Sequence, residues 1–258
     1  MKITLNFKKS ILMVAVILPL TAFHFIQKPT VYIIGDSTVR NTNKEQRGWG
    51  TFLEDHLDTT RIRVSNNAMA GRSTRTFIKE GRWHRVDSVL KKGDFVFMQF
   101  GHNEGSAPDT TRNGRRGVLP GIGEETKELT WPDGTHEVVH TYGWYIRKFV
   151  KETKAKGAIP VVVSMIPRND WKEGKVLRAD DNFGKWASEV AAQENAYFVD
   201  LNKIVADKYD QLGPEKVKEL FPGDHTHTNE AGAKLNAACV AEGIKSIKKM
   251  PLNNYMRE

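Results

Sequence analysis

The chain has 258 residues, of which 39% are hydrophobic and 27% are charged. These proportions are typical of one sizeable globular domain and exclude collagen-like, low-complexity and natively disordered proteins. The formal net charge is +8, and the single cysteine, Cys239, excludes an intrachain disulfide.

The start of the chain differs from the rest. Three lysines precede the apolar stretch 11–23, which is too short to span a bilayer comfortably. A basic start followed by a short apolar run is typical of a secretory signal, and we expect cleavage after Ala22. Residues 1–22 are then the signal peptide and residues 23–258 the mature domain. The alternative is an uncleaved N-terminal anchor.

We therefore expect an exported bacterial protein, periplasmic or secreted, without stable membrane insertion after processing. The positive charge attracts polyanions, and an acidic polysaccharide suits an exported protein, whereas a nucleic acid does not. A plain solvated surface accounts for the same charge. Nothing in the sequence indicates an oligomeric state.

Apolar, β-branched runs alternate with helical patterns along the remaining chain. Strands are predicted near residues 30–35, 61–66, 94–100, 159–164 and 196–199. Helices are predicted at 142–156, 183–194 and about 230–248. Gly157 and Asn195 fit C-terminal helix stops. This alternation predicts an α/β fold in which a five-stranded parallel sheet is covered by helices on both faces.

Polar residues that suit catalysis follow three of these strands. The first strand runs into Gly35-Asp36-Ser37-Thr38, so Ser37 lies at the carboxyl end of a strand, where open α/β sheets bind ligands. Gly71 follows the second strand, and Asn103 follows the third. We expect Asp36 to brace its loop, and His102 to be a structural or substrate-rim histidine rather than a second base.

Asp224 and His227 lie three residues apart in the C-terminal third. If the segment forms one helix-like turn, the carboxylate can accept a hydrogen bond from Nδ1 of the ring and leave Nε2 to face Ser37. Acyl transfer needs such a set of serine, base and orienting carboxylate. His225 beside this pair raises the alternative of a metal site, but no second His/Cys cluster completes a coordination sphere.

Four ordered blocks, GDST, NNAMAGRSTRTF, FGHNE and FPGDHTHTNEAGA, together resemble the SGNH or GDSL hydrolase superfamily, and within it the rhamnogalacturonan acetylesterase-like branch. The resemblance spans residues 31–247 and implies a three-layer, flavodoxin-like fold. It implies Ser37 as the nucleophile, His227 as the base and Asp224 as its orienting carboxylate. No metal or organic cofactor is implied.

The resemblance also implies an oxyanion hole. The main-chain N–H groups of Ser37 and Gly71 and the side-chain amide of Asn103 would form it. Two positions depart from the common family pattern: Thr38 stands where Leu is frequent, and Glu104 stands where Asp is frequent. We expect Glu104 to support its loop rather than to take part in the chemistry.

The activity implied is that of a serine carbohydrate esterase that removes O-acetyl groups from plant cell-wall polysaccharide of the pectin or rhamnogalacturonan type through an acetyl-enzyme. Its partner would be an acetylated polysaccharide or oligosaccharide. Two alternatives stay open. One is a lipase, thioesterase or general short-chain esterase with the same triad, and the other is a non-catalytic polysaccharide-binding module.

A Gly- and Pro-rich stretch, 105–140, follows Asn103 directly and is too long for a simple connection. We expect it to border the active site as a lid or binding edge. Its arginines could bind uronate carboxylates, and its tryptophan could stack on a sugar ring. The candidate substrate contacts are Arg112, Arg115, Arg116 and Trp131. The alternative for all four is a solvated loop.

Overall fold

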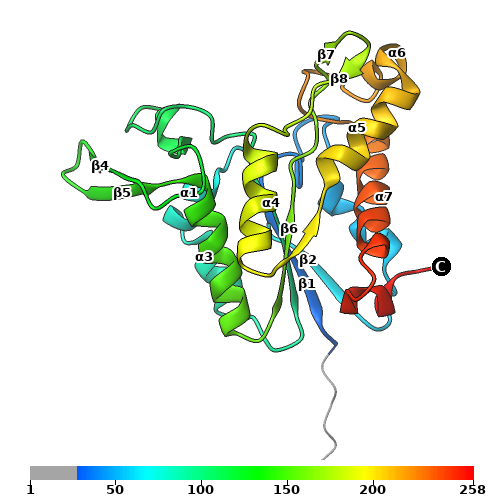
Figure 1. Ribbon diagram of the computed structural model, residues 1–258, viewed down its shortest axis with the longest axis horizontal. Helices are drawn as coiled ribbons and strands as arrows, with labels where there is room; N and C mark the ends of the chain where they lie inside the picture. The colour runs from blue at the N-terminus through cyan, green and yellow to red at the C-terminus, as the bar shows by residue number, and fades with distance from the viewer. Residues whose placement is uncertain (1–27) are drawn as a thin grey trace, which may run out of the picture.

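The computed structural model describes residues 28–258, so the predicted signal at 1–22 lies outside the described residues. A five-stranded parallel sheet forms the centre of the fold (Figure 1). Its strands are β1 (Thr30–Gly35), β2 (Arg63–Asn66), β3 (Phe95–Gln99), β6 (Ile159–Val163) and β9 (Tyr197–Val199). All five begin and end within two residues of the predicted bounds, which confirms the α/β prediction.

The strand order is β2-β1-β3-β6-β9. The chain moves outward from β1 to β2 on one side and from β3 to β9 on the other, as in flavodoxin-like sheets. In sheets of this order, ligands bind where the direction reverses, at the carboxyl ends of β1 and β3. Ser37 and Asn103 follow those two strand ends.

Helices cover both faces of the sheet, as predicted. One face carries α1 (Thr74–Lys79), α2 (Arg82–Asp87), α3 (Tyr142–Ala155) and α4 (Phe183–Gln193). The other carries α5 (Leu201–Leu212), α6 (Pro214–Lys218), α7 (Glu230–Ser246) and the 3-10 turns η1 (Trp49–Thr51), η2 (Leu53–His56) and η4 (Pro251–Tyr255). Because side chains alternate along a strand, Ile33 packs on the α7 side and Ile34 on the α3 side.

Helix ends lie where the sequence places them. Asn229 caps α7, since its side chain accepts a hydrogen bond from the main-chain N–H of Gly232 at 3.0 Å. Gly157 and Asn195 have left-handed backbone angles, with φ of +70° and +48°, directly after α3 and α4. The cap at Asn229 fixes the start of α7 two residues after His227.

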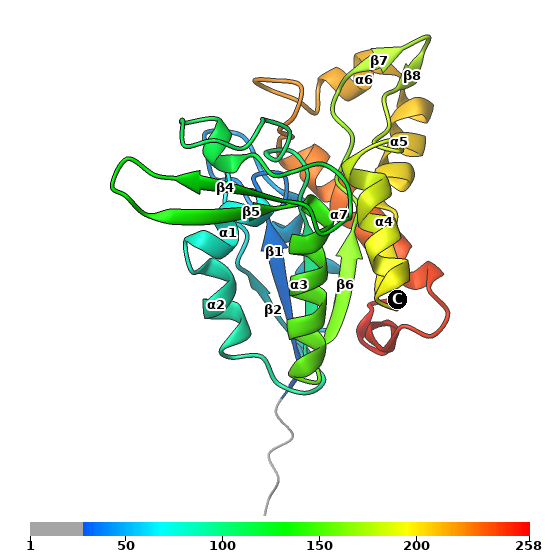
Figure 2. The same ribbon diagram turned by 60° about the vertical axis from the view of Figure 1, so that its left-hand side comes forward.

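The stretch 105–140, which we expected to be a long loop, contains regular elements. It contains the short turn η3 (Gly114–Arg116) and an antiparallel hairpin of β4 (Thr126–Thr130) and β5 (His136–His140), which extends away from the central sheet (Figure 2). A second, smaller hairpin, β7 (Trp171–Lys172) and β8 (Lys175–Val176), follows the end of β6. The two hairpins lie on opposite sides of the carboxyl edge of the sheet (Figure 1).

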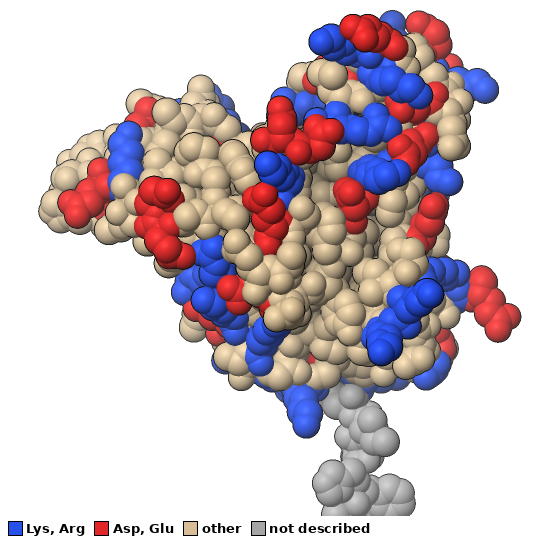
Figure 3. Space-filling view, in the orientation of Figure 1, with Lys and Arg blue, Asp and Glu red and all other residues tan. Residues whose placement is uncertain are grey.

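On the face shown in Figure 3, lysine and arginine side chains alternate with aspartate and glutamate, without a large area of one sign. The outline is lower between the β4–β5 projection and the α6 region. Within residues 28–258, none of the helices combines the length and the apolar character that crossing a bilayer requires.

Candidate active site

The serine of the first block lies just past the end of β1, and the turn that holds it is tight. A Cβ added at Gly35 would come within 2.6 Å of the carbonyl oxygen of Gln99, so only glycine fits there. Main-chain N–H groups of Val39 and Arg40 donate to the carbonyl of Asp36 and close the turn. The result is a fixed position for Ser37, whose side chain is nearly buried.

Ser37, His227 and Asp224 form a continuous hydrogen-bonded chain. Ser37 Oγ lies 2.8 Å from His227 Nε2, although 190 residues separate them. His227 Nδ1 lies 2.7 Å from Asp224 Oδ2. An imidazole held in this way can take a proton from the hydroxyl at Nε2 while its Nδ1–H stays directed at the carboxylate. Activation of a serine nucleophile requires contacts of this kind.

The segment from Asp224 to His227 does not form the helix-like turn that we expected. It bends instead, and Asp224 Oδ1 accepts from the main-chain N–H groups of Thr226 at 2.7 Å and His227 at 2.8 Å. Burial works to raise the pKa of Asp224, but the hydrogen bonds from the His227 ring and from these N–H groups hold it at about 2. The carboxylate is therefore ionised at neutral pH.

Three hydrogen bonds attach the histidine loop to the residues after β1. Gln46 Nε2 donates to Asp224 Oδ2 at 3.2 Å. The main-chain N–H of Arg47 donates to the carbonyl of Thr228 at 2.8 Å, and the Thr228 hydroxyl donates back to the carbonyl of Arg47 at 3.1 Å. The sequence reasoning missed Gln46 and Arg47, since nothing in the charged segment around them signals a contact almost 180 residues away.

Three hydrogen-bond donors were predicted to form the oxyanion hole. Within residues 28–258, the main-chain N–H groups of Ser37 and Gly71 donate to no protein acceptor. Asn103 Nδ2 donates to the carbonyl of Arg72 at 3.1 Å, which holds the amide beside Gly71 and leaves its second N–H free. The main-chain N–H of Met69 donates to the carbonyl of Gly35 at 3.0 Å, which ties the glycine block to the serine block.

Glu104 supports the loop after β3, as expected. Its buried carboxylate accepts from the main-chain N–H groups of Thr74 at 2.8 Å and of Gly101 and Asn103 at 3.0 Å. Burial raises the pKa of Glu104 to about 8, the nearby Asp36 carboxylate adds to the rise, and the three N–H donors oppose it. One side chain thus connects the glycine block to the asparagine block.

Thr38, one of the two departures from the common family pattern, has a specific role beneath the serine. Its hydroxyl donates to Asp36 Oδ1 at 2.8 Å and accepts from Gln99 Nε2 at 2.7 Å. Gln99 Oε1 in turn accepts from Trp49 Nε1 at 2.7 Å. Burial raises the pKa of Asp36 to about 6. Asp36 braces the turn, as predicted, and a leucine at position 38 could not make these bonds.

The surroundings of His225 and His227 do not indicate a metal site. His225 Nδ1 lies 2.7 Å from Asp170 Oδ1, and His227 is shared between Ser37 and Asp224. In the part of the chain that the structure describes, no three His, Cys, Asp or Glu side chains are grouped to hold a metal ion. Burial lowers the pKa of His102 to about 3, so its ring is neutral, which agrees with a structural or rim histidine.

The four candidate substrate contacts lie in different surroundings. Arg112 and Arg115 are exposed near η3. Arg116 Nη1 donates to Asn103 Oδ1 at 3.1 Å, so this arginine orients the asparagine amide, a role that we did not predict. Trp131 lies at the tip of the β4–β5 hairpin with Lys79 Nζ 3.4 Å from the centre of its ring. The structure thus brings Arg116 to the predicted oxyanion hole and places Trp131 in a separate cluster.

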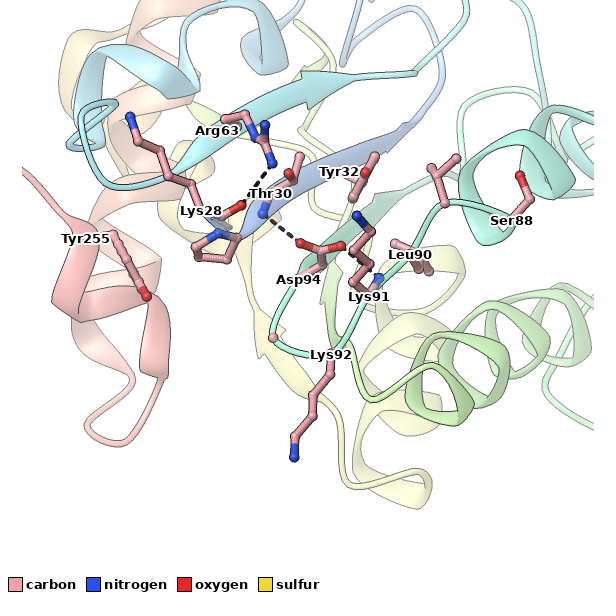
Figure 4. Close-up of a pocket in the computed structure, with 13 residues that line it drawn as sticks. Lys28, Thr30, Tyr32, Arg63, Ser88, Leu90, Lys91, Lys92, Asp94 and Tyr255 are labelled. Carbon is pink, nitrogen blue, oxygen red and sulfur yellow. Dashed lines mark hydrogen bonds between the residues drawn. The ribbon is translucent and has the colours of Figure 1, made fainter. Parts of the chain in front are cut away.

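A cavity of about 610 Å³ lies at the opposite, amino end of the sheet. It is lined by Lys28, Arg63, Asp94 and Tyr255, among others (Figure 4). Asp94 accepts there from the main-chain N–H of Thr30 at 2.8 Å. None of the four sequence blocks contributes to this cavity, so it is separate from the serine site.

Comparison with known proteins places this arrangement in a family. The chain is 34% identical over 215 residues to the rhamnogalacturonan acetylesterase of Emericella nidulans, covering 83% of this chain and 84% of that protein. It is 31% identical over 224 residues to the probable rhamnogalacturonan acetylesterase YesY of Bacillus subtilis, covering 84% and 93%. The crystal structure of Bacillus subtilis YxiM matches with a TM-score of 0.67 and 24% identity, over 84% of this chain and 56% of that one.

The YxiM likeness, at 24% identity, shows the fold alone, whereas the two sequence relatives exceed 30% identity over 83% and 84% of the chain. The family model described as the GDSL-like lipase/acylhydrolase family matches residues 33–235, which include the serine, glycine and asparagine blocks and both triad partners of Ser37. The protein belongs to the GDSL-like lipase/acylhydrolase family.

Proposed function

We propose that the protein is a serine carbohydrate esterase that removes O-acetyl groups from plant cell-wall polysaccharide of the rhamnogalacturonan type. The observation that supports the proposal is the hydrogen-bonded set of Ser37, His227 and Asp224. Ser37 Oγ lies 2.8 Å from His227 Nε2, and His227 Nδ1 lies 2.7 Å from Asp224 Oδ2. The two relatives named as known and probable rhamnogalacturonan acetylesterases support the substrate class. An acetylated polysaccharide or oligosaccharide is then the partner.

In the first half of the proposed reaction, Ser37 Oγ attacks the carbonyl carbon of the acetyl group while His227 Nε2 takes the hydroxyl proton. Negative charge develops on the carbonyl oxygen. The N–H groups of Ser37 and Gly71 and the Asn103 amide are the donors for that charge, and such a donor is worth about 3 to 4 kcal/mol of barrier. The C–O bond to the sugar then breaks, and His227 gives its proton to the leaving sugar oxygen.

In the second half, His227 takes a proton from a water molecule whose oxygen attacks the acetyl-enzyme. The same three donors hydrogen-bond to the oxyanion that forms in this second attack. Collapse of the intermediate releases acetate and returns the proton to Ser37 Oγ. Asp224 holds the imidazole in one tautomer throughout and stabilises its cationic form. The scheme uses no metal or organic cofactor.

We also infer that the protein is exported. The support is the lysine-flanked apolar stretch 11–23, which we interpret as a signal peptide with cleavage after Ala22. The mature protein would meet its polymer in the periplasm or outside the cell. Mass determination of the N-terminus of the protein recovered from a bacterial host would show whether residues 1–22 are removed.

The function is tested by acetate release from acetylated rhamnogalacturonan and acetylated xylan, compared with p-nitrophenyl esters of increasing acyl length. We expect acetyl groups to be removed fastest and Ser37→Ala to lose at least about 10⁴-fold in kcat. Ser188→Ala is the matched control, because its hydroxyl bonds only within α4.

A preference for long acyl chains would instead identify a lipase, which is the principal alternative. Polysaccharide binding without turnover of any ester would identify a binding module. Acetate release by Ser37→Ala at the wild-type rate would show that Ser37 is not the nucleophile.

A further inference from the structure

A cavity of about 330 Å³ lies at the carboxyl end of β6, where residues of the loop after β3 line it as well. Its walls come from the loop after β3, the segment 165–170, the segment 177–182 between β8 and α4, and the starts of α4 and α5. Its volume is within the range of small-molecule sites, about 300 to 1,000 Å³. Neither the family pattern nor the sequence analysis assigned it a role.

Two residues place this cavity next to the reacting groups. His102, which lines it, precedes the oxyanion asparagine Asn103. Asp170, which also lines it, lies 2.7 Å from the ring of His225, two residues before the base. A sugar unit next to the acetylated one can therefore enter this cavity when the acetyl group reaches Ser37.

Arg168 is the unusual side chain of the cavity. In the part of the chain that the structure describes, its guanidinium makes one hydrogen bond, from Nη2 to the carbonyl of His102 at 3.4 Å. That contact is longer than an ordinary N–H···O bond of about 2.7 to 3.2 Å. Among residues 28–258, the buried Nε has no hydrogen-bond partner and no carboxylate forms an ion pair with the guanidinium. The guanidinium is therefore a cation with unused donors.

The other arginine of the cavity is already paired. Arg178 Nη2 donates to Asp207 at 2.7 Å and to Asp210 at 2.9 Å, so its charge is compensated. Asp170 hydrogen-bonds the ring of His225, which carries a charge only when protonated. Among residues 28–258, Arg168 is left as the arginine of this cavity that has no carboxylate partner.

We propose that Arg168 binds the carboxylate of a uronic acid unit next to the acetylated sugar, and that this cavity is the acid-recognising subsite of the enzyme. The inference rests on the proposed function, because it supposes a polysaccharide substrate. A guanidinium presents paired N–H donors that match a carboxylate, and charge-assisted bonds of this kind are the strong ones. A neutral sugar in the same place would leave those donors unpaired, so acidic polymers are favoured.

The test compares acetylated oligogalacturonides with acetylated linear xylo-oligosaccharides of the same length. For Arg168→Gln, we expect the ratio of kcat/KM for the acidic over the neutral substrate to fall at least about 10-fold, mainly through KM. Arg168→Lys should retain part of the preference, because an ammonium is a point charge without the bidentate geometry. Lys172→Gln is the control: it removes one positive charge from the neighbouring β7 outside the cavity.

An unchanged ratio in Arg168→Gln, or an equal loss on both substrates, would overturn the inference. If that variant does not fold, the wild-type protein decides the matter by competition. Galacturonate should inhibit hydrolysis of p-nitrophenyl acetate at a concentration about 10-fold lower than galactose does, and equal inhibition would contradict the subsite.

Failure of the proposed function gives a different result. A wild-type protein that hydrolyses p-nitrophenyl acetate but releases no acetate from either oligosaccharide would reject the carbohydrate esterase, and the subsite with it. A wild-type preference for the acidic substrate that survives in Arg168→Gln would reject the subsite alone.

Discussion

Glu104 accepts a hydrogen bond from the main-chain N–H of Thr74 at 2.8 Å, which joins the start of α1 to the loop after β3. The other carboxylate oxygen accepts from two N–H groups of its own loop. The glycine and asparagine blocks are therefore held to each other through one buried acid. An aspartate at this position has a shorter side chain, so one of the two blocks would have to move for the carboxylate to bond both.

The titration of Glu104 predicts how stability depends on pH. An unfolded glutamate releases its proton at a pH of about 4.3, whereas in the fold the pKa of Glu104 is about 8. Between these values the folded protein binds a proton that the unfolded chain has lost, so the free energy of unfolding falls as the pH rises from about 5 to 8. Urea unfolding at several pH values should show this slope, and Glu104→Gln should reduce it.

Burial also raises the pKa of Asp36, to about 6, so this residue makes the free energy of unfolding fall with rising pH as well. Asp36 is still present in Glu104→Gln. The slope of Glu104→Gln should therefore persist below about pH 6 and flatten above it. Identical slopes in both proteins would mean that Glu104 is ionised in the fold.

Asp224→Asn should lower kcat by about 10⁴-fold with little change in stability. The asparagine keeps an oxygen for the two main-chain N–H groups, but its NH₂ group faces His227 Nδ1 and favours the wrong tautomer of the ring. Asp170→Asn is the matched comparison, since Asp170 bonds the neighbouring His225 at the same 2.7 Å. Equal losses of kcat on p-nitrophenyl acetate in the two variants would show that Asp224 has no special part.

Asn103→Ala should lower kcat by about 10²- to 10³-fold while KM changes little, because the amide acts on charge that develops after binding. Arg116→Gln should give a smaller loss of about 3- to 10-fold, since the arginine only orients the amide through its 3.1 Å bond to Oδ1. Steady-state kinetics with p-nitrophenyl acetate would measure both. A loss confined to KM in Asn103→Ala would speak against an oxyanion donor.

Glu137 holds the β4–β5 hairpin against α1. It accepts from Arg75 at 2.8 and 3.0 Å, from Lys79 at 2.8 Å and from Trp131 at 2.6 Å. The Arg75 guanidinium is 1% exposed, so Glu137→Gln leaves a buried cation without its counter-charge, at a cost of about 3 kcal/mol. Thermal unfolding should shift down by about 6 to 12 °C.

Glu128→Gln, on the same hairpin but exposed, is the control for that variant and should leave the unfolding temperature almost unchanged. Burial works to raise the pKa of Glu137, but its bonds to Arg75, Lys79 and Trp131 hold it at about 2. The stabilisation by this carboxylate is therefore present at neutral pH and is lost as the pH falls from about 4 toward 2.

The sheet could be predicted because its strands are local, buried and β-branched. The helix ends could also be predicted from local residues. Asn229 caps the start of α7, and Gly157 and Asn195 adopt the left-handed backbone angles that end α3 and α4. The β4–β5 hairpin was missed although Pro132-Asp133-Gly134 between two strand-like runs is a turn signal. The density of glycine and proline before it led us to expect a loop throughout.

Long-range pairs that no shared chemistry requires could not be predicted from the sequence. Ser37 and His227 could be joined in advance because their chemistry requires a partner, but Gln46 meets Asp224 and Arg116 meets Asn103 through loop geometry alone. Arg168 is significant only because its surroundings lack a carboxylate, and that is a property of the folded molecule. Residue type therefore predicts the reacting groups, while their supports need coordinates.

Thr30 opens β1 at one end of the sheet, and Ser37 follows the other end of the same strand (Figure 1). An affinity tag, a bead or a surface attached ahead of Thr30 thus leaves from the side remote from Ser37, the proposed nucleophile. An enzyme immobilised through its amino end should present its working edge outward, where fibres too large to diffuse can still be deacetylated.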